Sequence, residues 1–174
     1  MKSKIAAITL LASTTLFGYS NTSFAETCYE ASGSVTTENV TSTLQIGNIS
    51  LTLSDDEGNV VFGENGSLVG NITGADGMFT TLLSHKARFP QGDSFVTNDD
   101  TAVPDVQYGN PVRAVDGNEV ACSYWIRETI SDIAKGTRFF KDATSVEVFA
   151  VGYISNCPDE NENSFILSGE LCVE

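Results

Sequence analysis

Length, composition and charge narrow the class of protein before any motif is considered. The chain has 174 residues, with 9 Lys or Arg against 23 Asp or Glu, and its net charge is −14 at pH 7. A chain this acidic repels nucleic acid and anionic membrane surfaces, so we expect no nucleic-acid partner. Its length fits a single domain with a real core.

The N-terminal 25 residues predict an export signal. Lys2 and Lys4 supply a positive start, and the mostly apolar run that follows them is too short to span a bilayer. Ser23 and Ala25 place small residues where a signal peptidase requires them. We therefore expect residues 1–25 to be a signal peptide.

The remainder, 26–174, is predicted to be one secreted or periplasmic domain. No later apolar run in it approaches the roughly 18 residues of a transmembrane helix, so no stable membrane insertion is expected. The oligomeric state is left open by the sequence.

Helix signals are nearly absent, and β-forming residues alternate with Gly or Asn-Asp clusters about every ten residues, the pattern of an antiparallel all-β fold. Strands are predicted at 29–37, 43–53, 59–63, 67–73, 78–89, 94–97, 111–115, 119–130, 145–156 and 164–173. The segment 98–111 is interpreted as one long irregular loop, because its two prolines and scattered Asp disfavour a strand. A short helical turn is predicted at 131–135.

The chain contains four cysteines, Cys28, Cys122, Cys157 and Cys172. An even number in an exported chain predicts two disulfides. A hairpin of 145–156 with 164–173 would hold Cys157 and Cys172 roughly 26 Å apart, whereas a disulfide needs Cα atoms within about 7 Å. Pairing 119–130 with 145–156 instead brings Cys122 opposite Cys157, which leaves Cys28 for Cys172. Without a CxxC pair and with a single histidine, no metal site and no cofactor is predicted.

A bridge between Cys28 and Cys172 joins the first strand to the last, as a closed barrel requires. The strand 145–156 is apolar on both faces, and Gly152 in its middle is typical of a bend where a sheet curls. We therefore predict an antiparallel eight-stranded closed barrel stapled by disulfides. A β-sandwich is the alternative.

The segment 136–153 resembles the G-T-G-x-F-x-x-A-x-G element of dirigent-like and allene oxide cyclase-like barrels. Gly136, Thr137, Phe140 and Ala143 match that element with one residue of slack, whereas Arg138 replaces its second Gly and Ser145 its last. In those families the element precedes a long barrel strand. The resemblance implies an eight-stranded calycin-like barrel and carries over no catalytic residue.

The candidate binding residues lie on two strands. His85 alternates in 78–89 with Phe79, Thr81 and other mostly apolar residues, and we expect this face to point inward, where His85 and Thr81 would hold the polar group of a ligand. Trp125 is an additional candidate as a platform for a ligand, and which face of 119–130 points inward is left open. Ser84 lies on the opposite face from His85, so no Ser-His pair forms and no catalytic residue is predicted.

Two acidic stretches are interpreted as structural rather than functional. Paired carboxylates such as Asp99 and Asp100 are expected to be hydrated turn residues. Oxygen ligands at Asp159, Asn161, Asn163 and Glu170 follow the spacing of a calcium loop, but Ser164 stands where that loop needs Gly and the flanks predict strands. An acidic hairpin loop explains the same residues.

Three functions fit these features. The first is a small barrel that binds an apolar or amphipathic small molecule near His85, Thr81 and Phe79. The second is a structural or interaction module whose barrel is filled by side chains. The third is an isomerase of the allene oxide cyclase type, which needs an acid or base inside the barrel, with His85 and Glu128 as the first candidates.

Overall fold

The computed structural model describes residues 26–105, 113–115, 120–155, 157 and 160–174. The strands are β1 (Thr27–Asn39), β2 (Leu44–Ser54), β3 (Val60–Asp76), β4 (Thr80–Arg88), β5 (Ser94–Thr97), β6 (Asp100–Pro104), β7 (Arg113–Val115), β8 (Val120–Ile130), β9 (Ile133–Thr137), β10 (Ala143–Ser155) and β11 (Glu162–Val173). A 3-10 turn, η2 (Arg138–Phe140), is the one helical element among the described residues. Within this part of the chain, no helix has the length and apolar character needed to cross a membrane.

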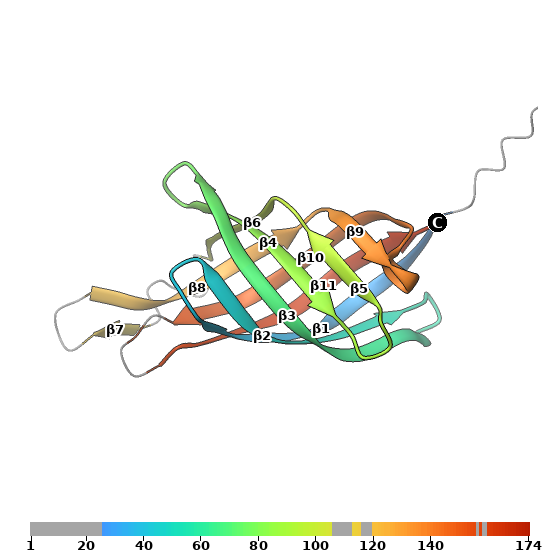
Figure 1. Cartoon of the computed structure of the whole chain (residues 1–174), viewed down its shortest axis with the longest axis horizontal. Helices are drawn as coiled ribbons and strands as arrows, with labels where there is room; N and C mark the ends of the chain where they lie inside the picture. The colour runs from blue at the N-terminus through green and yellow to red at the C-terminus, as the bar shows by residue number, and fades with distance from the viewer. Residues whose placement is uncertain (1–25, 106–112, 116–119, 156, 158–159) are drawn as a thin grey trace, which may run out of the picture.

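Eight of the strands form a closed antiparallel barrel (Figure 1). Around the ring the order is β1, β2, β3, β4, β6, β8, β10 and β11. The ring closes between the first and the last strand, where Thr27 pairs with Val173 and the register continues to Glu38 opposite Glu162. The fold class predicted from the sequence is therefore confirmed.

On one side of the barrel the wall changes partners along its length. The first half of β4 pairs with β6, with Leu82 opposite Thr101, and its second half pairs with β5, with Ala87 opposite Phe95. The short strand β9 in turn pairs with β5. Two short strands, β6 and β5, thus take the place of one long strand beside β4.

The two disulfides fasten opposite ends of the barrel. Cys28 is bonded to Cys172 with a Cα separation of 3.9 Å, beside the contact of the Tyr29 and Phe139 rings. Cys122 is bonded to Cys157 with a Cα separation of 4.9 Å, at the other end of β8 and β10. These are the same two pairs that strand geometry predicts from the sequence.

One end of the barrel is closed by an aromatic plug made of five rings. Its centre is Phe140, whose side chain is fully buried in the turn η2. The rings around Phe140 have centroids 5.1 to 5.9 Å from it and belong to Phe62, Phe89, Phe95 and Phe139. The plug therefore gathers aromatic residues from β3, β5, η2 and the end of β4.

Several predicted elements were wrong in their boundaries or type. Segments 59–63 and 67–73 form one strand, β3, because residues 64–66 between them stay paired with β2. Part of the predicted loop 98–111 is the strand β6, in which the proline stands at the last position and leaves the ladder intact. The predicted helical turn at 131–135 is instead the start of β9.

Gly152 lies in the middle of β10, directly opposite Phe165 of β11. A Cβ atom at this position would overlap the backbone oxygen of Ser164, so the two strands approach as closely as they do only because the side chain is absent. The structure thus shows a close approach of β10 and β11 at Gly152, whereas the bend expected there from the sequence stays a prediction.

Gly152→Ala should lower the free energy of unfolding by about 3 kcal/mol, because the methyl group forces backbone apart in a packed wall. Urea unfolding measures this change. Gly74→Ala in β3 is the matched control, since the nearest atom to its new Cβ is Leu82 Cδ1 at 3.8 Å. Equal stability of the two variants would contradict the close approach at Gly152.

Candidate binding site

The inward-facing residues of β4 show how the interior is organised from one end of the barrel to the other. Leu83 lines an open pocket at one end of the barrel, and His85, two residues on, lines an inner cavity. Ala87 is fully buried beyond that cavity, and Phe89 belongs to the aromatic plug. From one end to the other, the interior therefore has an open end, a level that contains the polar side chain of His85 (called the polar level below), and a closed aromatic end.

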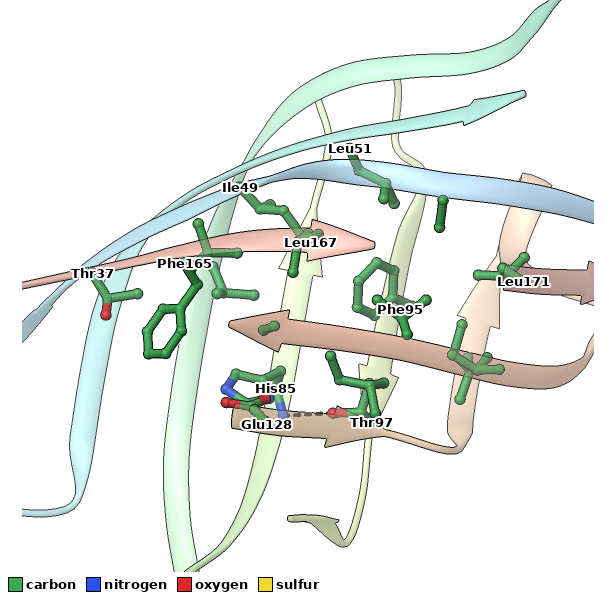
Figure 2. A pocket seen from close by; sticks show the side chains of 18 of the residues that line it. Thr37, Ile49, Leu51, His85, Phe95, Thr97, Glu128, Phe165, Leu167 and Leu171 are labelled. Atoms are coloured by element: carbon green, nitrogen blue, oxygen red, sulfur yellow. Dashed lines mark hydrogen bonds and ion pairs between the residues drawn. The ribbon is translucent and has the colours of Figure 1, made fainter. Parts of the chain in front are cut away.

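The inner cavity has a volume of about 70 Å³ and mostly aliphatic walls (Figure 2). Aliphatic lining residues come from both sides of the ring, among them Leu51, Val148 and Leu167. Polar side chains enter the lining at Thr37, Gln45, His85, Thr97 and Glu128. Figure 2 shows His85 and Glu128 lying side by side at the edge of this apolar space.

A mouth pocket of about 290 Å³ adjoins the inner cavity at the open end of the barrel. Gln45, Glu128 and Phe165 line both spaces, so they stand at the boundary between them. The outer rim of the mouth pocket includes Met78 and Phe79, whose side chains are 86 % and 68 % exposed. An apolar rim thus leads to a boundary that carries one carboxyl group and one amide.

His85 is held in place by a closed circuit of hydrogen bonds. Its backbone N–H donates to Thr97 Oγ1 at 2.9 Å, and the hydroxyl of Thr97 donates to Asp100 Oδ2. The same Asp100 oxygen lies 2.8 Å from His85 Nδ1. Because Asp100 is completely buried, this contact sets the orientation of the ring.

Glu128 makes a second carboxyl contact to the same ring nitrogen, with Oε1 3.2 Å from His85 Nδ1. Burial disfavours the charged imidazole, but the carboxyl groups of Glu128 and Asp100 outweigh burial and raise the pKa of His85. Burial raises the pKa of Glu128, with Asp100 adding to the effect and His85 opposing it. The polar level thus consists of the His85 imidazole and the carboxyl groups of Asp100 and Glu128, all held away from water.

The other edge of the imidazole faces Gly70, the residue directly across the sheet from His85. A Cβ atom at Gly70 would lie 3.0 Å from His85 Nε2 and 3.5 Å from Gln45 Oε1. Because Gly70 has no side chain, the imidazole ring fits against its backbone. The Nε2 atom of His85 and the Gln45 amide both lie near the position that a side chain at Gly70 would occupy.

The structure separates the four residues that the sequence proposes for ligand binding. His85 lines the inner cavity, and Thr81 and Phe79 line the mouth pocket. Trp125 lines neither space, because Glu128 and Ile126 take the inward face of β8. The Trp125 ring contacts Tyr153 at a centroid distance of 6.1 Å.

Asp100 was misassigned by sequence reasoning. It was expected to be a hydrated turn residue, but it is fully buried and bonded to His85. The signal that could have found it is the run Thr-Ala-Val directly after it, which forms β6 and carries Asp100 into the barrel wall. Thr97 and Gln45 had no signal in the sequence that set them apart from other polar residues on strands.

Of the residues with calcium-like spacing in the last hairpin, Asp159 lies outside the described residues. The others have structural explanations. The amide of Asn163 is fully buried, donates to Thr37 Oγ1 at 3.1 Å and accepts from the Ser155 N–H at 2.9 Å. Glu170 lies in the same extended strand, far along β11, opposite Glu30 and Glu147. Asn163 and Glu170 therefore do not converge on one ion.

The segment that resembles the dirigent-like element lies at the aromatic plug. Gly136 and Thr137 are the last two residues of β9, Phe140 fills the centre of the plug and Ala143 begins the long strand β10. Comparison of the chain with protein-family models, with curated proteins and with solved structures gives no match. The family resemblance thus stays a prediction from the sequence.

Proposed function

We propose that this chain is an exported, non-catalytic barrel that binds one small amphipathic molecule. The observation that carries the proposal is an inner cavity with aliphatic walls and a single polar level formed around His85 and Glu128. Sites for small molecules commonly combine apolar walls with a few converging polar groups. The two disulfides are compatible with an oxidising compartment outside the cytoplasm.

The volumes favour a slim or short ligand. The inner cavity of about 70 Å³ holds only a small apolar group, and the mouth pocket adds about 290 Å³ next to it. Pockets for drug-sized molecules span about 300 to 1,000 Å³. We infer that the apolar part of the ligand enters the cavity while its polar group stays at the boundary near Glu128.

A second candidate is favoured by one contact. An isomerase of the allene oxide cyclase type needs an acid or base inside the barrel, and His85 Nδ1 and Glu128 Oε1 lie 3.2 Å apart there. Recovery of a bound molecule unchanged after prolonged incubation favours the binding protein, whereas conversion to an isomer favours the enzyme.

The proposal predicts that filling the cavity abolishes binding. Ala150 is buried and lines the inner cavity, so Ala150→Leu should occupy the space that the ligand uses. Isothermal titration with hexanol, hexanoate and hexylamine should show binding of at least one probe to the native protein and at least tenfold weaker binding to Ala150→Leu.

Val151→Leu is the matched control, because the next residue of β10 points to the outside, opposite the exposed Ile166. Its affinity should equal that of the native protein. Failure of all three probes to bind, or equal affinities for the two variants, would contradict a ligand site in the cavity.

A further inference from the structure

The polar level brings three potential metal ligands together from neighbouring strands of the ring. His85 of β4, Asp100 of β6 and Glu128 of β8 each direct one ligand atom to a common point. The Nδ1 atom of His85 lies 2.8 Å from Asp100 Oδ2 and 3.2 Å from Glu128 Oε1, and all three atoms lie within 4.8 Å of one another.

Hydrogen bonding within the protein leaves this cluster incompletely satisfied. His85 Nδ1 carries at most one proton, yet two carboxyl groups approach it. Asp100 is completely buried, and its second oxygen, Oδ1, has no hydrogen-bond partner among the described residues. A buried carboxylate oxygen without a partner is costly, so something else is expected to contact it.

A metal ion at the common point would resolve both features. It would replace the shared proton between the imidazole and the two carboxyl groups. Because the two oxygens of Asp100 share one carbon, the ion at Oδ2 is also within reach of Oδ1. The Thr97 hydroxyl donates to Asp100 and would then orient this carboxylate toward the metal, as hydrogen bonds to metal ligands commonly do.

We propose that His85, Asp100 and Glu128 form a mononuclear site for a divalent transition-metal ion of the Zn²⁺ type. One imidazole with two carboxylates suits Zn²⁺ or Mn²⁺, whereas Ca²⁺ prefers six to eight oxygen ligands. Ligands bound tetrahedrally to Zn²⁺ lie about 3.3 to 3.6 Å from one another. The 2.8 Å contact of His85 with Asp100 therefore needs to open by about 0.5 to 0.8 Å, and its 3.2 Å contact with Glu128 by about 0.1 to 0.4 Å.

Three protein ligands leave one coordination position open. His85 and Glu128 both line the inner cavity, so the open position faces the space proposed for the ligand. The metal site stands independently of that proposal, because it is assayed with the metal alone. It departs from the sequence-based expectation of no metal, which counted cysteines and histidines and treated Asp100 as a turn residue.

The test is titration of the disulfide-intact, EDTA-treated protein with ZnCl₂ or MnCl₂ by isothermal calorimetry. We expect one Zn²⁺ per chain and at least 100-fold weaker binding of Mg²⁺ and Ca²⁺. Asp100→Asn and Glu128→Gln should each weaken Zn²⁺ binding at least 100-fold. Glu30→Gln, which removes one exposed charge from β1, is the matched control and should bind as the native protein does.

Thermal unfolding of each variant shows whether it is folded, and Glu128→Gln keeps the test intact if Asp100→Asn is not. Diffraction data collected at the zinc absorption edge from crystals soaked in ZnCl₂ should place one anomalous peak between His85, Asp100 and Glu128. Absence of stoichiometric binding, a peak elsewhere, or equal losses in Glu30→Gln and Glu128→Gln would overturn the proposal.

Discussion

Replacing Cys28 and Cys172 together by serine should lower the free energy of unfolding by about 5 kcal/mol, because the bridge closes a loop with a sequence separation of 144. In the chain-entropy description, a longer loop restricts the unfolded chain more strongly. This disulfide also ties the first strand to the last at the end of the barrel that holds the plug. Urea unfolding of the oxidised native protein and the double variant measures the difference.

The double variant of Cys122 and Cys157 is the matched comparison. Its bridge has a sequence separation of 35, so its removal should cost about 4 kcal/mol, roughly 1 kcal/mol less than removal of the longer one. If the Cys28–Cys172 variant proves the more stable of the two, the long bridge does not restrict the unfolded chain as the account requires.

Phe140→Ala should lower the free energy of unfolding by about 4 kcal/mol. The side chain is fully buried at the centre of the aromatic plug, and four other phenylalanine rings contact it. Truncation removes both the buried aromatic surface and the ring contacts, and it leaves a cavity that the closed wall cannot collapse around. Chemical denaturation monitored by circular dichroism measures the loss.

Phe79→Ala provides the control with the same chemical change. Its ring is 68 % exposed at the rim of the mouth pocket, so the stability should change by less than about 0.5 kcal/mol. Comparable losses in the two variants would mean that the plug is not a distinct packed centre of the fold.

The outline of the barrel follows from local patterns in the sequence. Alternation places β1, β2, β5 and β11 within a few residues of where they lie. The disulfide pairing follows from strand spacing alone, because register limits which cysteines come within bonding distance. The inward face of β4, with His85 on it, is likewise a consequence of period-two alternation.

The polar level inside the barrel could not be read in the same way. Its members, His85, Asp100 and Glu128, come from β4, β6 and β8, so their meeting depends on how these strands pair in the ring rather than on any local motif. Asp100 was missed because nearby prolines disfavour a strand, although Pro104 at the end of β6 costs no ladder bond. The inward face of β8 was undetermined because Trp125 and Ile126, its apolar candidates, lie on opposite faces.

The ring closes between β1 and β11 and holds His85 inside it, and both the fold and the site depend on this arrangement. A nuclear Overhauser spectrum of the isotope-labelled protein tests both parts at once. We predict cross-strand contacts along the whole β1–β11 register, including Val35 with Phe165, together with contacts between the His85 ring and the α-protons of Gly70. A spectrum without β1–β11 contacts, or with the His85 ring far from Gly70, would contradict the closed barrel and its interior site.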